Sequence, residues 1–399
     1  MRNRIGLVLA SLLVHAVTAY LGLNLQGMTP FNDVNLYSEW AARGLATNVW
    51  PGVSEPGVYP LLSLLPMALV EAFSPANPIL GWLVLVTVLN TALVWWISES
   101  KVGRHAAAYF LAFIAVLGPI AIGRIDSIAL VVDLAAVGLV ALGKFRAAAG
   151  FAVAAAWIKV WPAAQYLALL MAQKTADLKI KLLGVAAAVS LGVVSLAMFA
   201  NGNQNVFSFL WINSNRGLQI ESPIANIWMW GAKLGWGDSS VYFDSNIITF
   251  QVTGPFANTV ASLMTLSLLV ALSITAFLGW KATKAGAAPH EVFALVGMTA
   301  VLDLIVFNKV GSPQFHTWLA APLIAGILLG VQRWRFPLYL GLVLAALTAW
   351  IYPYNYDAVV NLDGFALAVL TLRNLLLIAF LVWANVRLSA LSSRAVRST

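Results

Sequence analysis

The chain has 399 residues, of which 61% are hydrophobic and only 10% are charged. A soluble domain needs more polar surface than this to cover its core, so the composition excludes one and indicates an integral membrane protein. The formal net charge of +8 does not indicate nucleic-acid binding, because the cations lie in short clusters between apolar runs. The chain has no cysteine, which excludes disulfides and thiol chemistry.

Apolar runs of membrane-spanning length recur along the chain, and the bilayer core admits such runs only as helices. We predict an all-α, polytopic integral membrane protein in which residues 1–399 form a single transmembrane domain of about 12 helices. The first run is expected to be a retained signal anchor, because it is long and lacks an Ala-x-Ala cleavage site. The predicted spans are 5–25, 79–97, 106–121, 124–142, 147–160, 162–173, 182–200, 256–279, 291–307, 315–331, 337–352 and 364–386.

Two stretches depart from this pattern. An additional span at 59–73 would make the number of crossings odd, so this stretch is predicted to re-enter the membrane or to lie at its surface. Pro162 interrupts the ladder of helical hydrogen bonds between two short apolar runs. The runs 147–160 and 162–173 are therefore expected to form a bent pair that does not reach full depth.

The positions of Lys and Arg predict the orientation in the membrane. Sixteen of the 23 can lie on one side, which the positive-inside rule assigns to the cytoplasm together with both termini. The absence of an Asn-x-Ser/Thr acceptor favours a bacterial plasma membrane. Three polar segments, 26–58, 201–255 and 352–364, then face outward. The sixteen are Arg2, Arg4, Lys101, Arg104, Lys144, Arg146, Lys174, Lys179, Lys181, Lys281, Lys284, Arg333, Arg335, Arg387, Arg394 and Arg397.

The seven remaining cations fall on the outer face or inside helices, which makes them candidates for function. A charge inside an apolar run is costly unless it is paired or reaches a wet cavity. They are Arg43, Arg124, Lys159, Arg216, Lys233, Lys309 and Arg373.

The first outer segment contains a predicted short helix from Asn32 or Asp33, either of which can cap it, to Arg43, with Gly44 ending it. Its chemistry depends on which side chains share a face.

At 100° per residue, Asp33 shares one stripe of this helix with Tyr37, Trp40 and Arg43. Aromatic rings stack on sugar faces and a carboxylate accepts a hydroxyl proton, so this stripe could line a sugar pocket. The alternative makes Asp33 a helix cap only and places Tyr37 and Trp40 in an interfacial aromatic belt.

The motifs that follow resemble a known family. After the helix that bears Asp33 comes Tyr59-Pro60-Leu61-Leu62, and four further motifs follow in order: Gly123-Arg124-Ile125-Asp126, Lys159-Val160-Trp161-Pro162, Asn215-Arg216-Gly217-Leu218-Gln219-Ile220-Glu221-Ser222 and Lys309-Val310-Gly311-Ser312-Pro313-Gln314. This ordered set, which covers most of the chain, resembles the GT-C glycosyltransferases. It is most similar to family 87, the polyprenol-phosphate-mannose-dependent phosphatidylinositol-mannoside mannosyltransferases. Two details depart from the family: Tyr-Pro-Pro appears as Tyr59-Pro60-Leu61, and Asn32 and Asn35 flank Asp33 in place of a second acid.

The resemblance implies a GT-C architecture with short helices in the outer loops. It implies transfer of a sugar, expected to be mannose, from a polyprenyl-phosphate donor to a hydroxyl of a glycolipid or lipoglycan acceptor on the extracytoplasmic face. Asp33 would be the general base of an inverting reaction, with Tyr59 among the substrate-binding residues. No nucleotide, metal or other cofactor is expected. The residues themselves also argue against a metal ion, because Asp33 with Asn32 and Asn35 would make a poor octahedral set of ligands.

Arg216 and its neighbours are candidates in the long outer segment. The planar guanidinium of Arg216 suits a phosphate, while Gln219 and Glu221 could hold sugar hydroxyls. The alternative is an Arg216–Glu221 pair that only folds the loop.

Lys309, Gln314 and His316 lie where two predicted spans meet. They could clamp the donor phosphate, with His316 donating a hydrogen bond or assisting the departure of the phosphate. The alternative is turn chemistry at Gly311 and Pro313 with a structural histidine.

Ionisable residues inside the spans are further candidates. Arg124 could pair with Asp126 or meet the lipid phosphate. Lys159 is a substrate-binding candidate that could pair with Asp133, and the same intramembrane rule applies to Asp303. Arg373 could extend its side chain to the membrane surface, or pair with Asp363 or another acid.

Two other functions remain open from the sequence. A carrier or flippase for a lipid-linked sugar would also hold intramembrane charges, but such proteins often have matching repeats with broken helices, and none is found here. An oligosaccharide ligase or polymerase acting on polyprenyl-diphosphate chains would share the basic outer loop.

Overall fold

All twelve runs predicted as spans are helical in the computed structural model, which describes residues 2–25, 30–200, 204–212 and 216–396. Asn215, Arg397 and residues 26–29 and 201–203 lie outside the described residues. Eight helical segments in this part of the chain are long and apolar enough to cross a membrane. They are α1 (Arg2–Leu23), α4 (Pro78–Ile97), α5 (Lys101–Leu117) with η2 (Gly118–Ala121), α9 (Ala176–Phe199), α11 (Ala257–Lys284), α12 (Pro289–Val306), α14 (Arg335–Ala349) with η6 (Trp350–Tyr354), and α16 (Gly364–Val396).

The other four predicted spans are shorter helices. At 1.5 Å per residue, the 10 residues of α8 cover about 15 Å, which is half of a hydrocarbon core of roughly 30 Å. Within the described ranges eight helices thus have spanning length, and the count of about twelve crossings stays a prediction. The shorter helices are α6 (Ile125–Ala141), α7 (Phe145–Ile158), α8 (Ala163–Ala172) and α13 (Ala320–Leu328), the last preceded by η5 (Pro313–Leu319).

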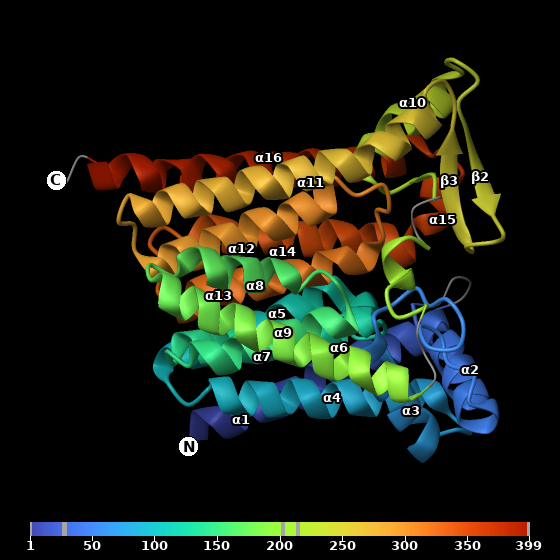
Figure 1. The fold of residues 1–399 in the computed structure, drawn as a ribbon. Coiled ribbons are helices and arrows are strands. Elements are labelled where there is room, and N and C mark those ends of the chain that lie inside the picture. The colour runs from blue at the N-terminus through green and yellow to red at the C-terminus, as the bar shows by residue number, and fades with distance from the viewer. Residues whose placement is uncertain (1, 26–29, 201–203, 213–215, 397–399) are drawn as a thin grey trace.

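Consecutive helices of the bundle run in alternating directions, so their connections gather at two ends (Figure 1). One end holds the start of α1, the end of α16 and the connections α4–α5, α6–α7, α8–α9, α11–α12 and α13–α14. These connections carry the cation clusters predicted to be cytoplasmic, and we call this the cation-rich end. All three predicted outer segments lie at the opposite end, which we call the site end.

Helix α12 lies inside the bundle and packs against α8, α11, α13 and α16. It is apolar on all sides and almost completely buried, as expected of a helix surrounded by other helices. By contrast, α1, α9 and α11 expose many large apolar side chains. Such surfaces suit contact with lipid rather than water.

The site end contains short elements packed over the bundle (Figure 1). The long outer segment forms a three-stranded antiparallel sheet in the order β1-β3-β2, with Leu218 opposite Val252 and Tyr242 opposite Gln251. Short outer helices were expected, whereas the sheet was not. The elements are α2 (Asn32–Thr47), η1 (Leu61–Ser63), α3 (Leu64–Phe73), η3 (Ser208–Leu210), β1 (Leu218–Gln219), η4 (Pro223–Ala225), α10 (Asn226–Leu234), β2 (Ser240–Asp244), β3 (Thr249–Thr253) and α15 (Tyr356–Val360).

Helix α2 differs from the prediction at both ends. Neither Asn32 nor Asp33 caps it, because Phe31 is the N-cap residue and Asn32 is already helical. Gly44 does not end it either, since the helix continues to Thr47. A Cβ at Gly44 would overlap the ring of Trp50, so this glycine permits close packing of Trp50 against the helix.

The stretch 59–73 forms η1 and α3 rather than a helix of spanning length. Its α-helical part has only 10 residues, and Leu65, Leu69 and Phe73 are exposed. This geometry fits the prediction of a re-entrant or surface segment.

Cysteine labelling tests the orientation, because the chain has no native cysteine. Glu39 and Lys233 are exposed at the site end, and Lys144 and Lys281 are exposed at the cation-rich end. A membrane-impermeant maleimide applied to intact cells is expected to label Glu39→Cys and Lys233→Cys, and to label Lys144→Cys and Lys281→Cys only after permeabilisation. Labelling of position 144 or 281 in intact cells would contradict the predicted orientation.

Candidate functional site

The connections between helices at the site end bring together side chains from the whole chain. Asp33 comes from α2, Arg124 from the start of α6, Lys159 from the α7–α8 connection and Glu221 from the segment after β1. Lys309 comes from the α12–η5 connection, and Tyr352 and Tyr356 come from the segment between α14 and α16. We call these side chains the polar cluster, together with Asp126, Arg216, Trp318 and Arg373, which contact or lie near them.

Asp33 forms an ion pair with Arg124 through its Oδ1 oxygen. Arg124 is almost buried and also donates a hydrogen bond to the Tyr352 hydroxyl at 3.3 Å. About a third of the Asp33 side chain, 34%, stays exposed. Asp33 is therefore the partner of Arg124 and not the cap of α2. Because a third of its side chain is exposed, a ligand can reach its carboxylate.

A second ion pair lies beside the first. Lys159 Nζ is 3.6 Å from Asp126 Oδ2, and the Trp318 indole donates to Asp126 Oδ1 at 2.6 Å. Lys159 therefore pairs with Asp126 and not with Asp133, which lies two helical turns deeper on α6, about 10 Å away along the axis. Arg124 does not pair with Asp126 either, because Arg124 pairs with Asp33 and Asp126 pairs with Lys159.

The aromatic stripe of α2 packs against the loop that follows it. The Tyr37 and Tyr59 rings are 6.0 Å apart, and Trp40 lies 6.1 Å from Tyr59. Lys159 Nζ stands 4.2 Å above the Tyr59 ring, a cation–π contact that connects the aromatic rings to the polar cluster. Tyr37 is buried, so Trp40 and Tyr59, which are half-buried, are the rings that a ligand could contact.

Arg43, at the other end of the stripe, forms an ion pair with Glu55 on the loop that follows α2. The structure therefore does not bring Arg43 to the polar cluster. Asp33 and Arg43 do share a face of the helix by their angular positions. Ten residues of helix nevertheless separate them by about 15 Å along the axis, so they cannot reach the same site.

Gln219 has a structural role that the sequence did not reveal. Its side-chain oxygen accepts hydrogen bonds from the Gly311 amide at 3.2 Å and from the Ser312 hydroxyl at 3.4 Å, and its Nε2 donates to Glu221 at 2.9 Å. Its backbone N–H donates to the Lys309 carbonyl. Gln219 thus ties the Lys309 loop to the Glu221 loop and has little capacity left for a sugar hydroxyl.

Gly311 lets these two loops approach closely. A Cβ at this position would overlap the backbone nitrogen of Ser222. The glycine is therefore required by packing between the loops, beyond the turn chemistry considered from the sequence.

Glu221 is fully buried and accepts hydrogen bonds at Oε2 from Gln219 and from the Tyr356 hydroxyl. Its Oε1 has no hydrogen-bond partner among the described residues. Burial raises the pKa of Glu221 to about 7, and nearby Arg373, Tyr356, Gln219 and Arg124 only partly oppose this rise. The alternative considered from the sequence, an Arg216–Glu221 pair, does not form among the described residues; the cation beside Glu221 is Arg373, which donates to the Glu221 backbone carbonyl.

This raised pKa predicts a pH dependence of stability. The folded protein keeps the Glu221 proton up to about pH 7, whereas the unfolded chain releases it near its ordinary value of 4.5. Since the folded state binds more protons in this window, stability is expected to fall as the pH rises through it, by a few kcal/mol at most. The melting temperature in detergent, measured from pH 4.5 to 8, should decline less steeply for Glu221→Gln than for the parent. Glu39→Gln, an exposed control, should follow the parent; a Glu221→Gln curve parallel to the parent curve would contradict the prediction.

Arg216 and Lys309 form the cationic side of the cluster. Burial lowers the pKa of Lys309, and the nearby Arg216 lowers it further. Burial also lowers the pKa of Arg216, with Tyr59 and then Asp244 acting in the opposite direction. Two partly buried cations close to each other repel, and an anion bound between them would relieve that repulsion.

His316 and Gln314 lie on η5, the element that follows the Lys309 loop. His316 is buried, its Nδ1 is 3.3 Å from the Pro313 carbonyl, and its Nε2 has no hydrogen-bond partner among the described residues. Gln314 is half-buried on the same element. The buried Nε2 is a polar atom to which a ligand could bond.

The cluster carries excess positive charge. Among its described side chains, the three carboxylates are Asp33, Asp126 and Glu221. The five cations are Arg124, Lys159, Arg216, Lys309 and Arg373. Asp244, which acts on Arg216, is a fourth acid, so the five cations outnumber the acids by one and the cluster favours a ligand with negative charge.

Several residues of the cluster were not selected from the sequence, namely Trp318, Tyr352 and Tyr356. Asp126 was considered only as a local partner of Arg124. The sequence left the partner of Arg373 open between Asp363 and another acid; in the structure it donates to the Asn374 side chain and to the backbone carbonyl of Glu221. Its position inside an apolar run was the available signal. The tyrosines and Trp318 gave no comparable signal, because aromatic residues also occur as packing and as interfacial belts.

Within the described residues, no three His, Cys, Asp or Glu side chains gather as metal ligands would. The expectation of a metal-free reaction stays a prediction. The chain matches no model of a known protein family and no curated protein sequence.

Proposed function

We propose that this protein is a membrane glycosyltransferase that uses a polyprenyl-phosphate sugar, expected to be mannose, as donor. The observation that carries the proposal is the polar cluster: a partly exposed carboxylate, half-buried aromatic rings and an excess of cations converge where six helix connections meet. A sugar phosphate presents the complementary groups, namely apolar ring faces, hydroxyls and a negative charge. The acceptor would be the hydroxyl of a glycolipid or lipoglycan.

Asp33 is the proposed general base. A sugar hydroxyl is a poor nucleophile and attacks the anomeric carbon only if its proton is removed as the new bond forms. The acceptor oxygen would bond to the anomeric carbon while the bond from that carbon to the phosphate oxygen breaks. The proton passes to Asp33, and the electron pair leaves with polyprenyl phosphate. A single base with attack opposite the leaving group inverts the anomeric centre.

Arg216, Lys309 and His316 are the proposed donor-phosphate ligands. The phosphodiester carries one negative charge and gains another as it departs, so cations already in position lower the barrier. Trp40 and Tyr59 would contact the sugar. Arg124 would hold Asp33 in orientation, and Gln219 would position the two loops without touching the sugar.

The predicted orientation would put this site on the extracytoplasmic face of a bacterial plasma membrane. Lipid-linked donors can reach a site at the membrane boundary without leaving the bilayer, which suits a site built from helix connections.

Transfer by the purified protein tests the function. Protein in detergent is incubated with polyprenyl-phosphate-[14C]mannose and a panel of lipid acceptors, and labelled products are separated by chromatography. Transfer of label to a lipid acceptor is the expected result. Absence of transfer, combined with movement of the labelled donor across liposomes that contain the protein, would replace the transferase with the carrier considered from the sequence.

A further inference from the structure

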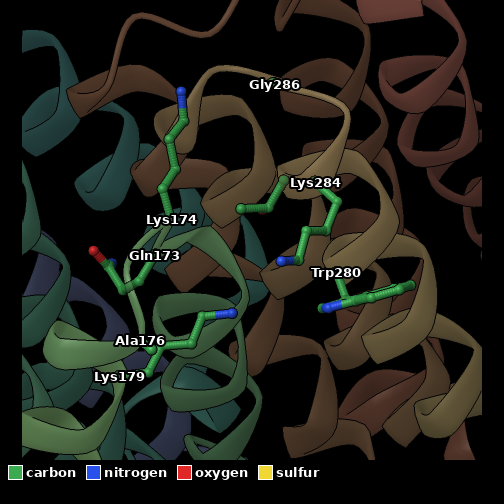
Figure 2. A pocket seen from close by; sticks show the side chains of 8 residues that line it. Gln173, Lys174, Ala176, Lys179, Trp280, Lys284 and Gly286 are labelled. Atoms are coloured by element: carbon green, nitrogen blue, oxygen red, sulfur yellow. The ribbon is translucent and has the colours of Figure 1, made fainter.

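The cation-rich end contains a hollow of about 460 Å³ between the α8–α9 and α11–α12 connections, far from the polar cluster (Figures 1 and 2). It is lined by Lys174, Lys179 and Lys284, by Trp280 and by Gln173, among others, and contains no acidic lining residue. The acid nearest in sequence, Asp177, already pairs with Lys181. The lining of the hollow therefore carries three cations and no acid.

Figure 2 shows how the lining side chains lie. The ammonium groups of Lys179 and Lys284 and the indole nitrogen of Trp280 point toward a common space, whereas Lys174 points away toward the loop that bears Gly286. These three groups are all hydrogen-bond donors. Ala176, the first residue of α9, also lines the hollow, and the α9 N-terminus has no side-chain cap. A helix N-terminus favours an anion, although Asp177 already lies in this first turn.

The position of the hollow is that of lipid headgroups. Lys179 lies in the first turn of α9 and Lys284 in the last turn of α11, and both helices are of spanning length. The ends of spanning helices meet the headgroup layer of a bilayer.

An apolar groove continues from the hollow along α11. It has a volume of about 360 Å³ and is lined by Leu269, Val270, Ser273, Ile274 and Phe277. The Phe277 and Trp280 rings are 5.9 Å apart, so the groove and the hollow adjoin through this pair. At 100° per residue, Ser273, Phe277, Trp280 and Lys284 share one face of the helix.

We propose that this face binds an anionic phospholipid, with its phosphate in the hollow beside Lys179 and Lys284 and an acyl chain along the groove below Trp280. A polar hollow joined to an apolar groove matches a molecule with a phosphate head and a hydrocarbon tail, and matches free phosphate only in part. The site does not use the polar cluster, and it stands whether or not the protein transfers sugars.

Native mass spectrometry of the full-length protein in detergent tests the site. Phosphatidylglycerol and phosphatidylcholine with identical acyl chains are titrated separately, and the dissociation constant of the first bound lipid is measured. The parent is expected to prefer phosphatidylglycerol. Lys179→Gln/Lys284→Gln is expected to weaken phosphatidylglycerol binding about tenfold and to leave phosphatidylcholine binding unchanged.

Lys101→Gln/Lys144→Gln is the matched control, because it removes two exposed lysines from the same end without touching the hollow. This control is expected to keep the parental affinity. Equal phosphatidylglycerol affinity in both double variants would overturn the proposal. Displacement of phosphatidylglycerol by millimolar inorganic phosphate would also overturn it, because it would make the hollow a site for soluble phosphate.

Discussion

Asp33→Asn is expected to lower the turnover of sugar transfer at least about a hundredfold, the scale of losing a general base. Asparagine keeps the shape of the side chain and an oxygen that can accept from Arg124, but it cannot take the acceptor's proton. Its position at the second residue of α2, where it does not cap the helix, leaves the fold little reason to change. The measurement is the rate of label transfer at saturating donor, with the donor KM and the melting temperature measured alongside. The KM and the melting temperature are expected to stay near their parental values.

A double variant distinguishes two roles of Asp33: a general base, or a residue that only neutralises the charge of Arg124. If Asp33 only neutralised Arg124, removal of both charges in Asp33→Asn/Arg124→Gln would restore turnover. With Asp33 as the base, the double variant stays inactive. Glu39→Gln is the control on the same helix, since Glu39 is exposed and lies off the stripe of Asp33, and it should retain activity. Near-normal turnover in a folded Asp33→Asn protein would remove Asp33 from the mechanism and make Glu221 the next carboxylate to test.

Arg216→Ala and Lys309→Ala are each expected to lower kcat/KM for the donor tenfold or more. A charge-assisted hydrogen bond contributes about 1.5–3 kcal/mol, and 1.4 kcal/mol corresponds to a factor of ten. In the proposed mechanism these charges contact the donor phosphate and not the acceptor hydroxyl, so the acceptor KM should change little. The measurement is the initial rate over a range of donor concentrations at fixed acceptor.

Lys233→Ala is the matched control, because this lysine lies in the same outer segment, on α10, but is exposed and outside the polar cluster. It should retain parental kinetics. If Arg216→Ala and Lys309→Ala both kept full donor kcat/KM, the phosphate clamp would lie elsewhere in the cluster, with Arg124 and Lys159 the next cations to replace.

Individual residues of the candidate site could be predicted from the sequence, but most of their partners could not. Asp33, Tyr59, Arg124 and Lys159 were selected one by one, and the structure brings them together. Their partners were not predicted, because a partner in a helical bundle comes from another connection, often more than 100 residues away. Arg124 with Tyr352 and Glu221 with Tyr356 are examples. From its chemistry, Gln219 was a candidate sugar ligand. Its structural role becomes visible only in the tertiary structure, for example in its hydrogen bond from Gly311.

The sequence by itself determined the class of protein, the position of nearly every helix and the separation of the cation clusters from the polar outer segments. These features are local: apolar length decides whether a run is helical in a membrane, and the frequency of Lys and Arg between runs decides the end to which a connection belongs. The tertiary structure decided which charges pair, which carboxylate stays accessible, and where a cationic hollow adjoins an apolar groove. Those features depend on helix packing, and a shift of one turn, about 5.4 Å, is enough to exchange the Asp126 partner of Lys159 for solvent or lipid.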